Sequence, residues 1–347
     1  MKKVPVGILG ATGMVGQRFI QLLDDHPWFE VAAVAASDRS AGRRYSDACR
    51  WLLPGAVPSK VAGLPVRPLD PALDCELVFS ALPSDVAGPV EESFADAGYA
   101  VCSNAASHRL DPDVPLLIPE VNWQHTALIG VQRRRRKGFI ATGPNCSTAA
   151  LTLALRPLHD AFGVRRVFVV TMQALSGAGY PGTASLDILG NVIPHIGGEE
   201  AKVEQEPLKL LGTLTGDGVA GASIILSAQC NRVPVRDGHT ECVSIELETK
   251  TEQRDVVAAL QNYEAPPGVI DLPSTPRRPV VVRTEPDRPQ PARDRDAGCG
   301  MSVSVGRVRP CPLLDHKFVL LGHNTVRGAA GGSIHNAELL VKQRWLG

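Results

Sequence analysis

The stretch VPVGILGATGMVGQRFIQLL, residues 4–23, decides the fold of the first half of the chain. Its apolar start predicts a strand, and the residues from Gly13 onward predict a helix. Gly10, Gly13 and Gly16 occupy the turn with the spacing G-x-x-G-x-x-G, not the more common G-x-G-x-x-G. Small residues let a backbone approach a pyrophosphate closely, and the start of a helix offers it free N–H groups. This turn therefore predicts a dinucleotide-binding site, with a plain tight turn as the alternative.

The pattern of elements changes about halfway along the chain. Up to about residue 142, apolar strands such as ELVFSAL and GFIAT alternate with helical stretches, which indicates a parallel sheet covered on both faces. From Val164, longer strands such as RRVFVVTMQAL and TECVSIELET are joined by loops, which indicates a mainly antiparallel sheet with helices on one side. We predict an α/β chain with a Rossmann-type N-terminal domain (residues 1–145, completed by a helix at 328–347) and a C-terminal α+β domain (residues 146–327).

Composition excludes several classes of protein. The 347 residues are 44% apolar and 21% charged with a formal net charge of zero, which argues against a nucleic-acid partner. No apolar run approaches the ~18 residues of a membrane span. The eight cysteines form no C-x-x-C pair, so we predict no metal site and expect reduced thiols in a cytoplasmic protein. The basic run at 133–136 is interpreted as a solvated loop.

The end of the second predicted strand indicates which dinucleotide binds. The sequence there is ASDRSAG, residues 36–42. A 2′-phosphate is bound by arginine and hydroxyl groups, whereas a bare ribose prefers an acid at this position. Ser37, Arg39 and Ser40 favour NADP, and Asp38 is the one residue that argues for NAD.

A cysteine lies where a second apolar strand turns into an apolar helix, in GFIATGPNCSTAALTLAL, residues 138–155. Most cysteines are buried thiols that act as small hydrophobes, and this remains the alternative for Cys146. At a helix N-terminus, however, the dipole stabilises a thiolate, and a thiolate can form a thioester that a neighbouring reduced nicotinamide then reduces by hydride transfer. Downstream segments supply candidate partners for this chemistry: Gln173, Glu199, Lys202, Arg232 and His239. His195 precedes Glu199 by four residues, but the intervening glycines argue against a metal pair.

With these residues the resemblance becomes specific. The segments GATGMVGQRF, SNAASHR, PNCSTAALTLAL, ALSGAGYPG, IGGEEAKVEQE, VPVRDGHTECV and HNTVRGAAGG resemble, in order and over nearly the whole chain, the aspartate-semialdehyde dehydrogenase family in its archaeal and fungal branch. The resemblance implies NADPH-dependent reductive dephosphorylation of L-aspartyl 4-phosphate, in the biosynthesis of threonine, methionine, isoleucine and lysine. It also implies a cytoplasmic homodimer or homotetramer, with the C-terminal domain serving catalysis and dimerisation.

The resemblance also assigns roles to residues. Cys146 would be the nucleophile, His239 the acid–base group and Gln173 the residue that orients the acyl group. The substrate and inorganic phosphate would be bound by Arg232 (carboxylate), Glu199 (amine), and Arg109, Asn145 and Lys202 (phosphate). The cofactor would be lined by Gly10, Thr12, Gly13, Met14, Val15, Ser37, Arg39, Ser40, Ser80, Gly177 and Asn324.

Two features depart from the family pattern, and two alternatives stay open. Gly143 replaces the asparagine usual before Pro144, and Cys299 is an additional thiol without an assigned role. A reductase of a malonyl thioester or of N-acetylglutamyl phosphate would use the same cysteine and histidine. The helix that carries Glu199 and Lys202 favours the aspartyl substrate. A non-catalytic dinucleotide sensor would have no use for this thiol, imidazole and two arginines together.

Overall fold

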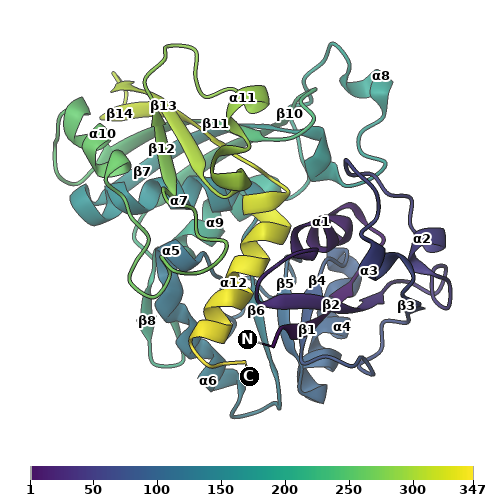
Figure 1. The fold of residues 1–347 in the computed structure, drawn as a ribbon. Helices are drawn as coiled ribbons and strands as arrows, with labels where there is room; N and C mark the ends of the chain where they lie inside the picture. Colours follow the sequence, from purple (N-terminus) through teal and green to yellow (C-terminus); the bar gives the residue numbers. More distant parts are fainter. Residues whose placement is uncertain (1, 347) are drawn as a thin grey trace.

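The computed structural model describes residues 2–346. Two six-stranded sheets form its two halves, and helix α12 (Gly331–Lys342) runs between them down the middle of the molecule (Figure 1). Met1 and Gly347, the outermost residues of the predicted domain ranges, lie outside the described residues. Among residues 2–346, no helix combines the length and the apolar composition that crossing a membrane requires.

The first sheet is parallel throughout, as the apolar strands predict. Its order is β3-β2-β1-β4-β5-β6, which places the turn after β1 at the centre of the sheet. The strands are β1 (Val4–Leu9), β2 (Phe29–Ala35), β3 (Val66–Arg67), β4 (Leu77–Ser80), β5 (Ala100–Ser103) and β6 (Phe139–Thr142). Such a sheet binds ligands beyond the carboxyl ends of its strands, where the order of the strands reverses.

Helices cover both faces of this sheet because its strands are apolar on both sides. Helix α1 (Met14–Leu23) and the distant α12 share one apolar cluster, in which Phe19 and Ile334 pack with the strand residues Ile8 and Phe79. Helix α4 (Ser84–Ala97) covers the opposite face through a second cluster that contains Phe94. The last helix of the chain therefore packs on the sheet formed by the first 142 residues.

The second sheet is mixed, with the order β10-β7-β11-β14-β13-β12. Its strands are β7 (Val164–Gln173), β10 (Ile225–Arg232), β11 (His239–Leu247), β12 (Val280–Arg283), β13 (Val303–Pro310) and β14 (His316–Gly322). The β10–β7 and β12–β13 pairs are parallel, so this sheet is less antiparallel than the sequence suggested. Helices α7 (Cys146–Phe162), α9 (Glu199–Leu210) and α10 (Gln253–Gln261) supply the core that covers one face. The predicted fold class, a Rossmann-type half followed by an α+β half, is confirmed.

A buried ion pair connects the two halves. Glu120, in the short helix α5 (Pro119–Asn122), forms two hydrogen bonds with the guanidinium of Arg327, of which the Arg327 Nη1–Glu120 Oε2 bond is 3.1 Å long. Arg327 lies in a π-helical turn, η4 (Val326–Ala330), directly before α12. Arg327 Nε also donates to the carbonyl of Met301 at 2.7 Å. Both side chains are buried, so the removal of either charge would leave the other without compensation.

Candidate active site

The predicted nucleophile lies at the first position of α7, where the two halves meet. Asn145 caps this helix, since its Oδ1 accepts hydrogen bonds from the amides of Ser147 (3.0 Å) and Thr148 (3.3 Å). Gly143 donates its N–H to the carbonyl of Ser103 at 2.8 Å, so a main-chain bond braces the turn where the family usually has asparagine. The cap and this bond hold Cys146 at the end of a rigid helix.

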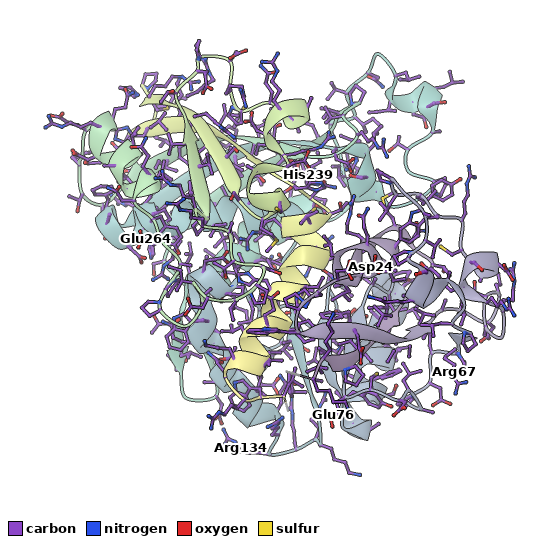
Figure 2. All side chains as sticks on the ribbon, viewed as in Figure 1. Asp24, Arg67, Glu76, Arg134, His239 and Glu264 are labelled. Atoms are coloured by element: carbon purple, nitrogen blue, oxygen red, sulfur yellow. The ribbon has the colours of Figure 1, made fainter. Side chains whose placement is uncertain are left out.

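His239 is the partner of Cys146. Its Nε2 lies 3.2 Å from the Cys146 Sγ, although 93 residues separate the two in the sequence. His239 opens β11 and lies close to the junction of the two halves (Figure 2). Figure 2 also shows Arg134, from the basic run, at the opposite end of the molecule, where it pairs with Asp217. The basic run therefore takes no part in the site.

A main-chain amide determines which nitrogen of His239 carries the proton. The N–H of Ala174 donates to Nδ1 at 3.0 Å. In a neutral imidazole one nitrogen accepts and the other donates, so the proton is on Nε2, which faces the sulfur. Burial, reinforced by the positive charge of Arg232, lowers the pKa of His239 to about 3. The imidazole of the free protein is therefore neutral and presents an N–H to Cys146.

The thiol is not ionised in the free protein, contrary to the expectation from its helix position. Desolvation raises the pKa of Cys146 to about 12, and the negative charge of Glu199 adds to the rise. Arg109 and Arg232 oppose this shift without overcoming it. The dipole of one helix end is worth ~0.3–1 kcal/mol, less than the cost of placing a thiolate among protein atoms. The resting pair is thus a thiol and a neutral imidazole.

Glu199 is fully engaged by neighbouring donors. Its Oε1 accepts from Lys202 Nζ at 2.8 Å, and its Oε2 accepts from Asn145 Nδ2 at 2.7 Å and Gln173 Nε2 at 3.3 Å. Although burial opposes ionisation, these hydrogen bonds lower the pKa of Glu199, so it stays a carboxylate. Gln173 ends β7 next to Met172, which pairs with Thr240, the residue after His239 on the neighbouring strand β11. Four predicted residues, Asn145, Gln173, Glu199 and Lys202, thus form one hydrogen-bonded group beside the cysteine.

The two predicted arginines approach the site from different sides. Arg232, at the end of β10, donates from Nη1 to the carbonyl of Ala174 at 2.7 Å. Arg109 donates from Nη2 to the carbonyl of Asn104 at 2.7 Å and from Nη1 to Glu206 Oε1 at 2.9 Å. Both guanidinium groups are largely buried yet line one cavity, as cations that bind an anionic ligand must.

Most of the predicted residues line this one cavity, whose volume is about 610 Å³. The predicted residues that line it are Thr12, Gly13, Met14, Val15, Arg109, Asn145, Cys146, Gly177, Glu199, Lys202, Arg232 and Asn324. Sequence reasoning missed Arg50, Tyr180 and Gly328 of the lining, and it missed Glu206 behind it. A signal for Glu206 was its position in IGGEEAKVEQE, seven residues after Glu199, which places both on one helix face.

The glycine turn fits a dinucleotide phosphate. Gly10 has a φ of +76°, and a Cβ on Gly16 would lie 2.3 Å from the carbonyl oxygen of Gly10. Only glycine allows this close turn, which presents the N-terminus of α1 to the cavity. Gly10 itself is not part of the lining; it shapes the turn.

Several predicted cofactor residues lie outside the cavity wall. The side chain of Ser80 is completely buried in β4 and is not part of the cavity lining, whereas Ala81 to Ser84 line the cavity, so the assignment of Ser80 as a cofactor contact stays a prediction. Ser37, Arg39 and Ser40 form a largely exposed turn beyond the end of β2, the neighbour of β1. This turn is free to contact a group that extends from the cavity along the sheet edge.

Two glycines allow close contact with the reacting pair. A Cβ on Gly177 would lie 3.0 Å from His239 Cε1 and 3.0 Å from Arg232 Nη1. A Cβ on Gly328, in the π-helical turn, would lie 2.6 Å from Cys146 Cβ. Any larger residue at either position would have to displace the groups around the sulfur. Cys299, by contrast, is exposed and outside the cavity.

Comparison with known proteins identifies relatives over nearly the whole chain. Family models described as "Semialdehyde dehydrogenase, NAD binding domain" and "Semialdehyde dehydrogenase, dimerisation domain" match residues 5–129 and 155–327. The chain is 53% identical to the aspartate-semialdehyde dehydrogenase of Archaeoglobus fulgidus over 342 residues, covering 98% of each protein. The chain belongs to the aspartate-semialdehyde dehydrogenase family.

Solved structures of relatives share the fold, and two of them contain bound ligands. The Candida albicans enzyme, solved with NADP, is 42% identical with a TM-score of 0.92, and the match covers 99% of this chain and 100% of that one. The Vibrio cholerae enzyme II, solved as a complex with ASA, is 27% identical with a TM-score of 0.77, and the match covers 99% of each chain. The family membership predicted from the motifs is confirmed.

Proposed function

We propose that this chain reduces L-aspartyl 4-phosphate to L-aspartate 4-semialdehyde with NADPH and releases inorganic phosphate. The observation that carries the proposal is the contact between Cys146, which lines the cavity that also reaches the glycine turn, and the buried His239, whose Nε2 lies 3.2 Å from the Cys146 Sγ. Thioester reduction requires a thiol with an N–H donor beside it and a dinucleotide site within reach of the thiol.

Different charged side chains bind the different charged groups of the substrate. Arg232 binds the substrate carboxylate, since its planar fork suits that group. Glu199 binds the amine through its carboxylate, which Lys202 holds ionised in the free protein. Lys202 and Arg109, beside Asn145, bind the phosphate.

The chemistry uses the side chains as they are protonated in the free protein. The Cys146 sulfur attacks the acyl carbon, the bond to the phosphate oxygen breaks, and the thiol proton leaves on the phosphate. Gln173 orients the acyl group so that its oxygen meets the Nε2–H of His239, the proposed acid–base residue. Bound NADPH supplies the hydride. The carbon–sulfur bond then breaks, the aldehyde departs, and the Cys146 thiolate takes a proton from solvent, which completes the consumption of one NADPH and one proton.

NADP is the proposed cofactor form. The glycine turn of Thr12 to Val15 receives its pyrophosphate, and the exposed turn of Ser37, Arg39 and Ser40 receives its 2′-phosphate. A relative solved with NADP supports this choice. The related reductases of malonyl thioesters or N-acetylglutamyl phosphate are less well supported, because the curated relatives at 43–54% identity are named for the aspartyl substrate.

The assembly and the domains follow the same reasoning. We propose a homodimer, able to pair into a homotetramer, that works in the cytoplasm; a dimerisation-domain match over residues 155–327 supports the dimer. The catalytic and dimerisation domain is taken as residues 146–327, and the cofactor domain as 1–145 together with 328–347.

An assay in the phosphorylating direction tests the function. NADPH formation at 340 nm is followed with aspartate semialdehyde, NADP and phosphate, each varied in turn. Arg232→Lys is expected to raise the KM for the semialdehyde more than tenfold and that for phosphate less than threefold. Lys202→Ala is expected to do the reverse. A wild-type protein with no saturable phosphate requirement, or activity only on acyl-CoA, would contradict the proposal.

A further inference from the structure

Glu206 is a buried acid next to the site to which no role has been given. It lies on α9, four residues after Lys202 and seven after Glu199, so all three side chains occupy the same helix face. The side chain is only 2% exposed. A carboxylate in such a place needs partners that compensate its charge.

Both oxygens of Glu206 have partners, and each belongs to a different part of the site. Oε1 accepts from Arg109 Nη1 at 2.9 Å, and Oε2 accepts from the main-chain N–H of Asn145 at 2.6 Å. Asn145 directly precedes Cys146. One carboxylate therefore connects the proposed phosphate-binding guanidinium to the main chain that carries the nucleophile.

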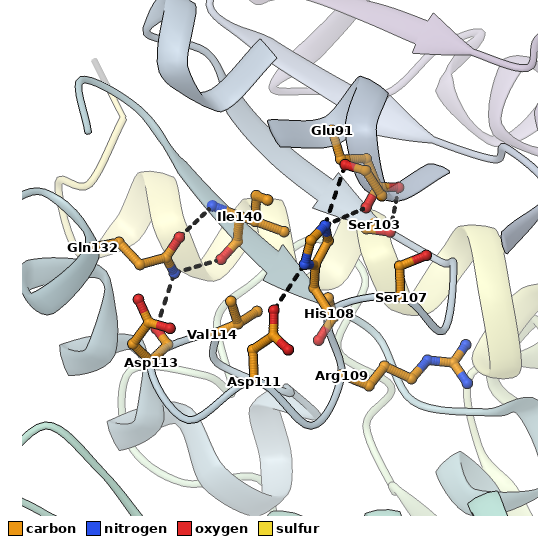
Figure 3. A network of polar contacts seen from close by, with 12 residues as sticks. Glu91, Ser103, Ser107, His108, Arg109, Asp111, Asp113, Val114, Gln132 and Ile140 are labelled. Carbon is orange, nitrogen blue, oxygen red and sulfur yellow. Dashed lines mark hydrogen bonds and ion pairs between the residues drawn. The ribbon is translucent and has the colours of Figure 1, made fainter. Parts of the chain in front are cut away.

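The segment around Arg109 is rigid on its other side as well. Figure 3 shows His108 held between Asp111, 2.8 Å from its Nδ1, and Glu91, 4.0 Å from its Nε2, while the Arg109 side chain points away from this network. Arg109 Nη2 also donates to the carbonyl of Asn104. Within residues 2–346, Arg109 Nε is buried without a hydrogen-bond partner. The guanidinium is thus fixed from two sides and keeps donor capacity for an anion.

We infer that Glu206 is a positioning residue for phosphate transfer, which fixes where Arg109 holds phosphate relative to the Cys146 sulfur. The inference rests on the proposed function. Attack of a phosphate oxygen on the thioester carbon requires the two atoms to start about 3–3.5 Å apart in line. The Glu206 carboxylate also offsets the charge of Arg109, so that phosphate is bound without being retained.

The variant Glu206→Gln separates this role from a structural one. The amide keeps one oxygen acceptor, so either Arg109 or the Asn145 N–H faces an NH2 group instead. Arg109 then carries an unbalanced charge and a looser position. Phosphate should bind at least as well as before, but in the wrong place for attack.

Two measurements on the full-length protein test the inference. The first is steady-state NADPH formation with varied phosphate. The second is the single-turnover burst of NADPH with semialdehyde and NADP in the absence of phosphate, which reports hydride transfer alone. For Glu206→Gln we expect a kcat at least 30-fold lower, a KM for phosphate unchanged or reduced, and a burst rate within threefold of the wild type. Glu204→Gln is the matched control: Glu204 lies on the same helix, but its Oε1 accepts from the N–H of Ala228 on β10, and all three values should be unchanged.

The outcomes are distinct. A wild-type protein without phosphate-dependent turnover would refute the proposed function. With that turnover present, a Glu206→Gln protein whose burst falls in parallel with kcat, or whose KM for phosphate rises more than threefold, would refute the positioning role. Unchanged kinetics would refute it equally.

Discussion

Gly177→Ala tests how closely the structure defines the catalytic pair. The added Cβ would lie 3.0 Å from His239 Cε1, 3.1 Å from His239 Nε2 and 3.0 Å from Arg232 Nη1. Favourable contact between such atoms begins at about 3.5 Å, so the imidazole must retreat by about 0.5 Å. A misplacement of about 1 Å can cost ~100-fold in rate, so half of that predicts about a tenfold loss in kcat, or ~1.4 kcal/mol.

The stability of this variant should change much less than its activity. The atoms that meet the new methyl group are the ends of side chains and not main chain, so the cost falls at the low end of the ~1–3 kcal/mol typical of overpacking. Initial rates of NADPH formation and urea unfolding measure the two quantities on the same preparation. Gly197→Ala is the control, because a Cβ there meets no atom within 4 Å. Wild-type kcat in Gly177→Ala, or equal losses in both variants, would refute the reasoning.

Three further predictions follow from the charges. Because the pKa of Cys146 is raised to about 12, its alkylation by iodoacetamide in the free protein should accelerate about tenfold per pH unit from pH 7 to 10. The Cys146→Ala variant identifies which part of the labelling occurs at Cys146, and a plateau in the rate below pH 8 would contradict the prediction. Arg39→Ala should raise the dissociation constant for NADPH about 10- to 100-fold and change that for NADH little, because a charge-assisted contact contributes ~1.5–3 kcal/mol. Fluorescence titration measures both constants, and equal losses of affinity would indicate misfolding. Glu120→Ala leaves Arg327 buried without its partner and should lower the free energy of unfolding by about 3–5 kcal/mol in urea; a change below 1 kcal/mol would show that water reaches the pair.

Local patterns predicted the parts of the site that depend on neighbours in sequence. The glycine turn could be predicted because its glycines, strand and helix are contiguous in the sequence. The sequence offered His239 as one of several candidate partners of Cys146, and the resemblance gave it the acid–base role, but no periodicity connects the start of one helix to the start of a strand 93 residues away. The structure is needed for this contact.

The structure differs from the sequence-based expectations where burial decides the property of a side chain. The charge state of Cys146 was inferred from its helix position, but desolvation by the surrounding halves outweighs the dipole. Ser80 was assigned to the cofactor from the resemblance, but its side chain is completely buried, and Ala81 to Ser84 line the cavity. Burial depends on what packs against a residue, and this is not encoded in the residue's own segment.

The packing of α12 on the first sheet has a consequence for how the protein is made. About 200 residues separate the end of β6 from the end of α12, so a ribosome needs ~10–40 s to synthesise the interval. During that time α1 is the only one of the two helices available to cover this apolar face of the nascent sheet. Gly328, which lies against Cys146, is also synthesised long after the cysteine. The nucleotide-binding half is therefore completed last although it is synthesised first. A polypeptide that lacks the segment from Gly328 through α12 cannot contain a complete cysteine site.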